Sequence, residues 1–232
     1  VEEEDAAGST ETPEPQRWRS ESQPDLPAES DTEPGPGGPA GAPSWRVVGV
    51  VHGRYVLLEG SDSLVLMEGE AARERILYES FLTSARKGEA ETQGLLVPVL
   101  LELEARDADV VLRNAANFAE AGMEVESFGG VTVQLRSLPA LLADSDPKAL
   151  LLEMVDGLVA SAEARSGRVL AFEKFASELA RVGARGERCR TESAQRLLDD
   201  LFACELPYCT PGGRPTLVQM ASSELARRFG RP

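Results

Sequence analysis

The segment Leu64-Val-Leu-Met-Glu-Gly-Glu-Ala-Ala-Arg-Glu-Arg-Ile-Leu-Tyr-Glu79 changes from a short aliphatic run to a pattern of helical period. Leu64 to Met67 is β-rich, which predicts a strand. Glu70 to Ala85 predicts a helix, because large apolar side chains recur four residues apart on one face. This predicted buried stripe consists of Leu77, Tyr78, Phe81 and Leu82. Arg75 and Glu79, also four apart, are interpreted as a solvated ion pair of little consequence.

Two more β-rich runs come before this segment. Trp45 to Val51 and Tyr55 to Leu58 are separated by His52-Gly53, and Gly60-Ser61-Asp62 separates the second run from Leu64. Glycine and aspartate at these points favour tight turns. The three runs therefore predict consecutive strands of one sheet.

The rest of the chain predicts a mixture of strands and helices. The predicted strands are 93–104, 123–128, 131–135 and 216–220, and the predicted helices are 107–121, 147–164, 170–182, 191–204 and 222–229. Ser222 is expected to cap the last helix. If the last strand returns to the first sheet, the middle of the chain forms an inserted subdomain. The predicted fold class is α+β.

The charge of this 232-residue chain is unevenly distributed. The net charge is −15, and residues 1–43 carry eleven acidic and two basic side chains, with eight prolines and five glycines. Such a composition predicts a disordered, self-repelling linker. The remaining net charge of −6 argues against this part as the main nucleic-acid surface. No apolar run is long enough to span a membrane, so no membrane association is expected.

Cysteine usage favours a reducing compartment. Cys189, Cys204 and Cys209 are odd in number and lie late in the chain, which is not typical of a disulfide framework. With His52 as the single histidine, they also fall short of a structural zinc module. We therefore expect a cytoplasmic protein.

Four stretches in order resemble the C-terminal domain of the MutL mismatch-repair family. The opening segment is similar to the family's Leu-Tyr-Leu-Ile-Asp-Gln-His-Ala-Ala-His-Glu-Arg-Ile-Leu-Tyr-Glu run. The other stretches are Leu95-Leu-Val-Pro98, then Gly122 to Phe128 with Val133 to Pro139, and Pro207-Tyr-Cys-Thr-Pro-Gly-Gly-Arg-Pro-Thr216. The last resembles the family's Cys-Pro-His-Gly-Arg-Pro-Thr loop, and the likeness covers about residues 44–232.

The resemblance implies a domain organisation and a set of partners. Residues 1–43 would be the linker, 44–92 with 187–232 a homodimerisation subdomain, and 93–186 an external, regulatory subdomain. It implies no cofactor in this chain, since ATP and Mg²⁺ would bind an N-terminal ATPase domain outside it. The expected partners are a second copy, the replicative sliding clamp, a mismatch sensor and a helicase, in the bacterial cytoplasm and at the nucleoid during repair.

Many family members are metal-dependent DNA endonucleases, and this chain departs from their ligand pattern. Aligned with the family's Asp-x-His-x-x-x-x-Glu run, it has Glu68, Glu70 and Glu74. Thr210 and Gly212 stand where the terminal loop of the family has Cys and His, and Cys189 is a doubtful match for a supporting cysteine. The degenerate metal-site positions are therefore Glu68, Glu70, Glu74, Cys189, Thr210 and Gly212. With both imidazoles absent, no catalytic residue and no bound metal are predicted.

Gln93-Gly-Leu-Leu-Val-Pro98 fits the Gln-x-aliphatic-Leu-x-Pro pattern by which family members bind the sliding clamp. The predicted clamp-binding residues are Gln93, Leu95, Leu96 and Pro98. Two aliphatic side chains would fill an apolar pocket, Gln93 would fix the register, and Pro98 would hold the backbone extended. The alternative is that Leu95 and Leu96 belong to an ordinary strand core.

These observations leave three functional hypotheses. The favoured one is a non-catalytic homodimerisation and partner-recruiting domain of a mismatch-repair matchmaker. The alternative is a metal-dependent nicking endonuclease with a carboxylate-rich site. The third, direct DNA contact, depends on arginines that we interpret as solvated helix faces: Arg181, Arg185, Arg188, Arg190, Arg227, Arg228 and Arg231. DNA contact is therefore expected mainly outside this chain.

Overall fold

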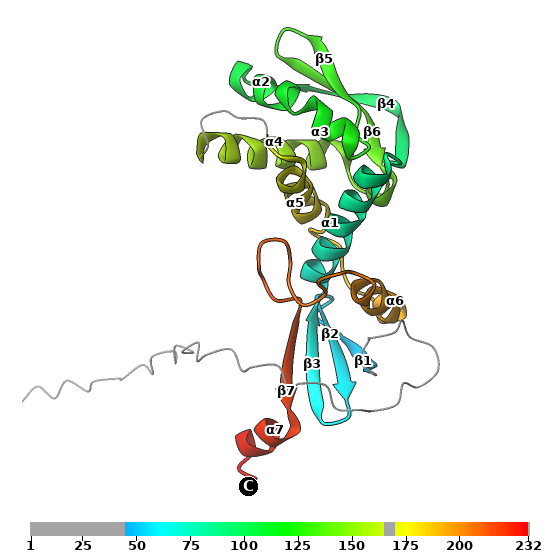
Figure 1. Ribbon diagram of the computed structural model, residues 1–232, viewed down its shortest axis with the longest axis vertical. Coiled ribbons are helices and arrows are strands. Elements are labelled where there is room, and N and C mark those ends of the chain that lie inside the picture. The colour runs from blue at the N-terminus through cyan, green and yellow to red at the C-terminus, as the bar shows by residue number, and fades with distance from the viewer. Residues whose placement is uncertain (1–44, 165–169, 232) are drawn as a thin grey trace, which may run out of the picture. The chain divides into compact units, whose positions relative to one another are not determined.

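The structure is a computed structural model that describes residues 45–164 and 170–231, without the side chains of 161–164. The predicted linker at residues 1–43 lies outside the described residues. The chain contains both helices and antiparallel sheets, as Figure 1 shows, and the α+β fold class is confirmed. Among the described helices, none combines the length and the apolar character needed to cross a membrane.

The first sheet combines the beginning and the end of the chain. It contains β1 (Arg46–Val51), β2 (Tyr55–Gly60), β3 (Ser63–Glu68) and β7 (Leu217–Ala221), in the order β1-β2-β3-β7. All neighbours are antiparallel, and β7 pairs with β3 so that Val218 lies opposite Leu66. The last strand therefore returns to the first sheet, which is the condition stated above for an inserted middle part of the chain.

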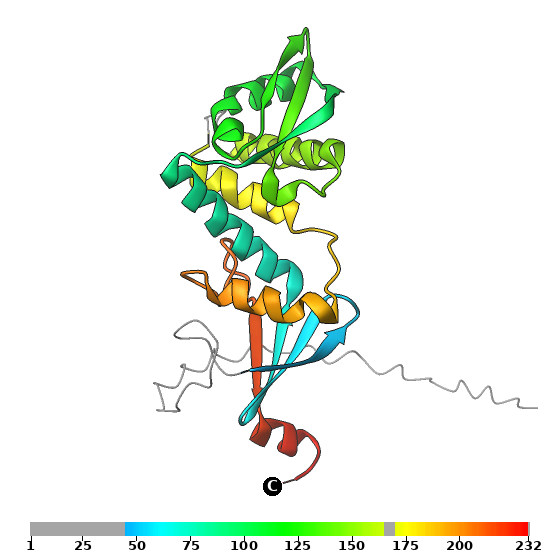
Figure 2. The ribbon, with the colours of Figure 1, turned by 90° about the vertical axis from the view of Figure 1, so that its right-hand side faces the viewer.

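Helix α1 (Gly69–Lys87) follows β3 without a loop. It begins at Glu68, whose carboxylate accepts a hydrogen bond from the backbone N–H of Ala71. It ends at Gly88, which adopts the left-handed conformation with φ 66° that glycine tolerates best. Figure 2 shows α1 running from the first sheet toward the second one.

The second sheet contains β4 (Thr92–Glu102), β5 (Val125–Gly129) and β6 (Thr132–Pro139), in the order β4-β6-β5. Its helical partners are α2 (Ala105–Arg113), α3 (Ala115–Glu120), the short 3₁₀ turn η1 (Ala140–Leu142), α4 (Pro147–Ala164) and α5 (Phe172–Gly183). The domain boundaries proposed from the resemblance remain a prediction.

The prediction of a single helix over 107–121 is wrong, because the helix is interrupted at Asn114. The side-chain nitrogen of Asn114 donates to the backbone carbonyl of Val110 at 2.8 Å. The side-chain oxygen of Asn114 accepts from the backbone N–H of Leu170 at 3.3 Å. A buried asparagine side chain thus competes with the helical backbone and ties this corner to a distant segment.

Helix α6 (Thr191–Phe202) and helix α7 (Ser222–Arg228) flank the last loop and strand. The predicted capping role of Ser222 is wrong: Ala221 occupies the capping position, and no side chain bonds to the helix start. The backbone N–H of Ser222 instead donates to the carbonyl of Asp62 at 3.0 Å.

Each sheet has its own apolar core. The first core lies between one face of the first sheet and helices α1 and α6, and consists of Val56, Leu58, Val65, Met67, Ala72, Cys189, Ala194, Leu198 and Leu201. The larger second core lies between the second sheet and helices α1 to α5 and includes Phe81. Leu77, Tyr78 and Leu82 pack against it, so the stripe predicted for α1 is confirmed.

Candidate functional site

The start of α1 holds the first predicted ligand position, Glu68. One carboxylate oxygen of Glu68 caps the helix, and the other accepts a hydrogen bond from Nε of Arg54 at 2.9 Å. This hydrogen bond, with the charge of Glu68, raises the pKa of the Arg54 guanidinium. Glu68 therefore serves as a helix cap and as the partner of a cation.

Glu74 lies six residues after Glu68, on α1, and is almost completely buried, with 3% of its surface exposed. Its carboxylate pairs with Nη2 of Arg214 at 2.6 Å. Glu74 is thus not a solvated surface charge but a buried member of an ion pair. A buried carboxylate requires a counter-charge, and here a guanidinium from the terminal loop, residues 203–216, provides it.

Thr210 and Gly212 form the turn that presents Arg214. Thr210 is buried, and its hydroxyl accepts a hydrogen bond from the backbone N–H of Arg214 at 3.2 Å. The backbone N–H of Thr210 donates to the carbonyl of Arg214 at 2.8 Å. A Cβ atom at Gly212 would have only ordinary contact with the Thr210 hydroxyl, so the turn has space for a side chain there.

Cys189 packs against the first turn of α1. Its thiol donates to the carbonyl of Arg54 at 3.7 Å and accepts from Nη2 of Arg73 at the same distance. A Cβ atom on Gly69 would lie 2.0 Å from the Cys189 sulfur, so only glycine allows this approach. Glu70 is the half-buried acidic residue of the same turn.

The residues at these positions do not fit a catalytic metal ion. In residues 45–164 and 170–231, excluding the undescribed side chains, no three His, Cys, Asp or Glu gather closely enough to hold one. Two of the predicted ligand positions carry carboxylates that are already paired: Glu68 with Arg54, and Glu74 with Arg214. No imidazole stands at any of the aligned positions. What the arrangement provides is a link between α1 and the terminal loop.

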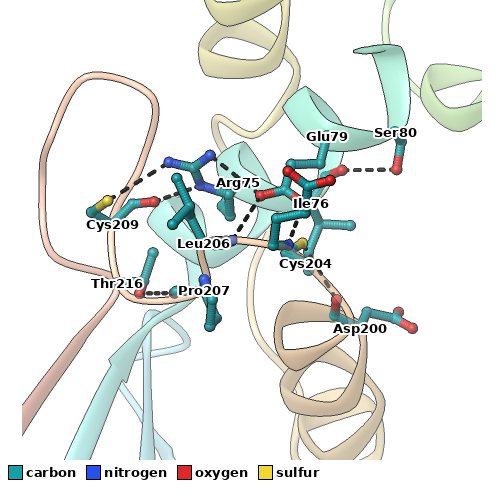
Figure 3. Close-up of polar contacts among 11 residues, drawn as sticks. Arg75, Ile76, Glu79, Ser80, Asp200, Cys204, Leu206, Pro207, Cys209 and Thr216 are labelled. Atoms are coloured by element: carbon teal, nitrogen blue, oxygen red, sulfur yellow. Dashed lines mark hydrogen bonds and ion pairs between the residues drawn. The ribbon is translucent and has the colours of Figure 1, made fainter. Parts of the chain in front are cut away.

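A second link lies beside the first, and Figure 3 shows it. Arg75 is buried, and its Nε donates to the carbonyl of Cys209 at 2.6 Å, while Nη1 lies 3.4 Å from a carboxylate oxygen of Glu79. Glu79 accepts hydrogen bonds from the backbone N–H groups of Glu205 at 2.6 Å and Leu206 at 3.2 Å. The prediction of a solvated Arg75–Glu79 pair is therefore wrong.

Sequence reasoning missed this link because spacing of four residues is equally typical of a surface pair. The available signal was the terminal loop itself, whose run of prolines and glycines offers few side chains to bond its own backbone. Burial, followed by the charge of Glu79, raises the pKa of the nearby Cys204 thiol to about 12. Cys204 is therefore a neutral thiol at physiological pH.

The predicted clamp-binding segment lies at the exposed edge of the second sheet. Pairing of β4 with β6 is irregular between Gly94 and Val99, so the residues between them leave the ladder. Gln93, Leu96 and Pro98 are exposed, Leu96 fully so, while Leu95 packs partly against the second core. An ordinary core position is thus excluded for Leu96.

One face of the first sheet has no part in either core. Side chains alternate along each strand, so the residues between the buried positions point to the opposite side. These residues, which we call the outer face, are Leu57 of β2, Leu64 and Leu66 of β3, and Val218 and Met220 of β7. Val218 is 55% exposed, and the other four are half-buried. A contiguous aliphatic patch on a sheet is typical of an interaction surface.

Several arginines proposed as DNA contacts have acidic partners. Arg181 pairs with Glu178, Arg185 with Glu153 at 2.8 Å, and Arg228 with Glu224 at 2.7 Å. Pairing with acidic side chains reduces the positive charge available to phosphates. This supports the interpretation of Arg181 and Arg228 as helix-surface charges, whereas Arg185 is a paired charge of the turn that follows α5.

The sheet with an uncovered aliphatic face and the carboxylates paired with arginines define an α+β assembly domain. A family model described as "MutL C terminal dimerisation domain" matches residues 48–194. This chain therefore belongs to the MutL family of DNA mismatch repair proteins, and its C-terminal dimerisation domain is the part seen here.

Individual relatives agree with this assignment. The chain is 44% identical over 186 residues to the DNA mismatch repair protein MutL of Akkermansia muciniphila, covering 80% of this chain and 29% of the relative. The MutL proteins of Desulforamulus reducens and Symbiobacterium thermophilum are 34% and 36% identical over 193 residues, covering 82% and 80% of this chain. The chain spans 30% of each of these two relatives.

Proposed function

We propose that this chain is the homodimerising, partner-recruiting part of a MutL mismatch-repair protein and does not itself cut DNA. The observation that carries the proposal is the outer face. Five aliphatic side chains lie on neighbouring strands, and the described cores leave them without a partner. A two-fold dimer brings the same patch of two copies together, which buries this surface without a second protein.

The segment Gln93–Pro98 supports a second role, which is docking onto the replicative sliding clamp. Leu96 is fully exposed on a stretch where β4 does not pair with β6, so its backbone and side chain are accessible together. An extended peptide with aliphatic anchors binds a pocketed surface through these features. The clamp remains a partner inferred from the motif.

Replacing Gln93 and Leu96 together with alanine is expected to abolish capture of the chain by immobilised sliding clamp. The two changes remove the residue that sets the register and an exposed apolar anchor, so affinity should fall by at least roughly tenfold. Val97→Ala is a matched control, because Val97 is 77% exposed in the same segment but outside the motif. Undiminished capture of the double variant would refute clamp docking by this segment.

The proposal that the chain does not cut DNA is supported by the ion pairs at the degenerate metal positions. Glu68 and Glu74 pair with Arg54 and Arg214, and Thr210 and Gly212 contribute no thiolate or imidazole. A hydrolytic metal site requires several converging ligands and one open position for water. The residues present provide a folded turn in place of such a set.

Supercoiled plasmid incubated with the purified chain and Mn²⁺ is therefore expected to stay intact. Agarose electrophoresis would separate nicked circles from the supercoiled form. Glu74→Ala, purified in parallel, distinguishes intrinsic activity from a contaminating nuclease. Nicking by the natural chain that disappears in the Glu74 variant would establish the alternative, an endonuclease with a carboxylate-rich site.

The remaining activities belong to the whole protein. We infer that an ATP- and Mg²⁺-binding N-terminal domain acts together with this dimer, and that a mismatch sensor and a helicase are further partners in the bacterial cytoplasm. The family relationship supports these roles, since the relatives named above are DNA mismatch repair proteins. The main DNA contacts are assigned to parts outside this chain.

A further inference from the structure

A groove of about 580 Å³ runs along one side of α1. Its walls come from segments far apart in the sequence. Ile76, Ser80, Thr83, Ser84 and Lys87 line it from α1, Asp200, Ala203 and Cys204 from the end of α6, and Glu120, Ala121, Pro139 and Leu141 from the second sheet and its helices. We call this the α1 groove.

The groove combines a small, partly apolar floor with exposed apolar walls. Ser80, Thr83 and Ser84 have short side chains, and the Ser80 hydroxyl already donates to the carbonyl of Ile76 at 2.8 Å. Leu141 is 56% exposed at one end, and Ile76 is half-buried at the other. Short side chains on a helix allow a second chain to approach closely, and Leu141 and Ile76 offer it apolar contact.

The rim of the groove is acidic. Glu89, Glu91 and Glu120 are exposed, and within residues 45–164 and 170–231 they form no ion pair, whereas Lys87 is the single cation lining the groove. The other two acids of the lining are already paired, Glu79 with Arg75 and Asp200 with Arg196 at 3.7 Å. Three unpaired carboxylates around this partly apolar groove attract positive charge.

We propose that the α1 groove binds a short segment of another protein that carries lysine or arginine beside aliphatic side chains. Charge complementarity selects this occupant, because the rim repels the phosphates of nucleic acid. A groove that is open along a helix and carries apolar side chains at both ends accepts side chains at several points, as a bound peptide requires. The groove shares no residue with the outer face or with Gln93–Pro98, so the inference is independent of the proposed dimer and clamp contacts.

Binding in the groove has a structural consequence. The occupant would touch α6, which belongs to the first core, and Leu141 and Glu120, which lie beside the second core. It would therefore bridge the two cores along α1. The neutral thiol of Cys204 forms part of the wall without adding a charge.

Selection of a random peptide library displayed on phage against the full 232-residue dimer tests the proposal. The expected result is an enriched group of peptides with basic and aliphatic residues, whose affinity for the chain falls with added salt. In fluorescence anisotropy, the double variant Glu91→Lys and Glu120→Lys should bind them at least tenfold more weakly. Leu141→Ser should also weaken peptide binding. Because this change removes an apolar contact and no charge, the dependence of the affinity on salt should stay the same.

Asp156→Lys is the matched control, since Asp156 is exposed on α4 and does not line the groove. It makes the same acid-to-lysine charge reversal, at one position instead of two, and should leave binding within twofold of the natural chain. Failure to enrich such peptides, or enriched peptides that bind the double variant undiminished, would overturn the proposal. Loss of the dimer in the double variant, measured by light scattering, would identify a second copy as the occupant and would also overturn it.

Discussion

Replacing Val218 with aspartate is expected to convert the homodimer into single protomers. Val218 is 55% exposed on β7 and lies opposite Leu66, so the protomer tolerates a polar side chain there. In a two-fold dimer through the outer face, the change places two unpaired carboxylates in an apolar interface. Burial of such charges costs several kcal/mol. The dissociation constant should rise by at least roughly 100-fold.

Light scattering during gel filtration at several protein concentrations measures this shift. Phe128→Asp is the matched control, because Phe128 is also a large apolar residue on a strand and is 60% exposed, but belongs to β5 of the other sheet. Its dimer should persist. A Val218→Asp chain that keeps its dimer mass at low micromolar concentration would show that the interface lies elsewhere on the molecule.

Replacing Arg75 with alanine should lower the free energy of unfolding by about 3–5 kcal/mol. The change removes the guanidinium that bonds the Cys209 carbonyl and leaves the carboxylate of Glu79 without its cation. Only 17% of the Glu79 side chain is exposed. Water can therefore replace the lost arginine only poorly as a partner of this carboxylate. Urea unfolding at fixed protein concentration measures the effect.

Arg113→Ala provides the comparison for Arg75. Arg113 also pairs with an acid four residues away on a helix, Asp109 at 2.8 Å, but both side chains are more than half exposed. Its removal should change the free energy of unfolding by about 0.5 kcal/mol or less. Equal effects of the two variants would mean that the buried link does not hold the terminal loop.

The Arg75–Glu79 link also bears on assembly. It anchors the terminal loop at Glu205, Leu206 and Cys209, shortly before the chain enters β7. The carbonyl of Thr216 then accepts a hydrogen bond from the backbone N–H of Glu68 at 2.9 Å. The charges of α1 therefore help to position the edge strand that contributes Val218 and Met220 to the outer face.

Local patterns in the sequence were sufficient for most of the fold. The predicted elements correspond to strands and helices of the structure, and α4 has the predicted bounds of 147 and 164. The predictions failed where a polar group of the side chain or backbone bonds outside its own helix. Asn114 breaks a predicted helix through a bond to the distant Leu170, and the cap expected at Ser222 lies at Ala221. Neither partner can be identified from spacing along the chain.

The candidate sites show the same division. The motifs identified the family, because residue type and order along the chain define it, and they are also the basis for the predicted ligand positions and the predicted clamp segment Gln93–Pro98. The sequence could not show that Arg214 neutralises Glu74, 140 positions away, or that Leu96 lies outside the strand ladder. It also left open which sheet face is uncovered.

The sequence by itself determined the period of most strands and helices, the acidic composition of residues 1–43 and membership in the MutL family, since these depend on neighbouring residues and on order. Only the tertiary structure decided which charges are buried and which surfaces are free. Arg75 and Arg113 have the same spacing to an acidic partner, yet one pair holds a loop in place and the other lies in water. The difference arises from the desolvation of charges, which depends on the segments that pack around them.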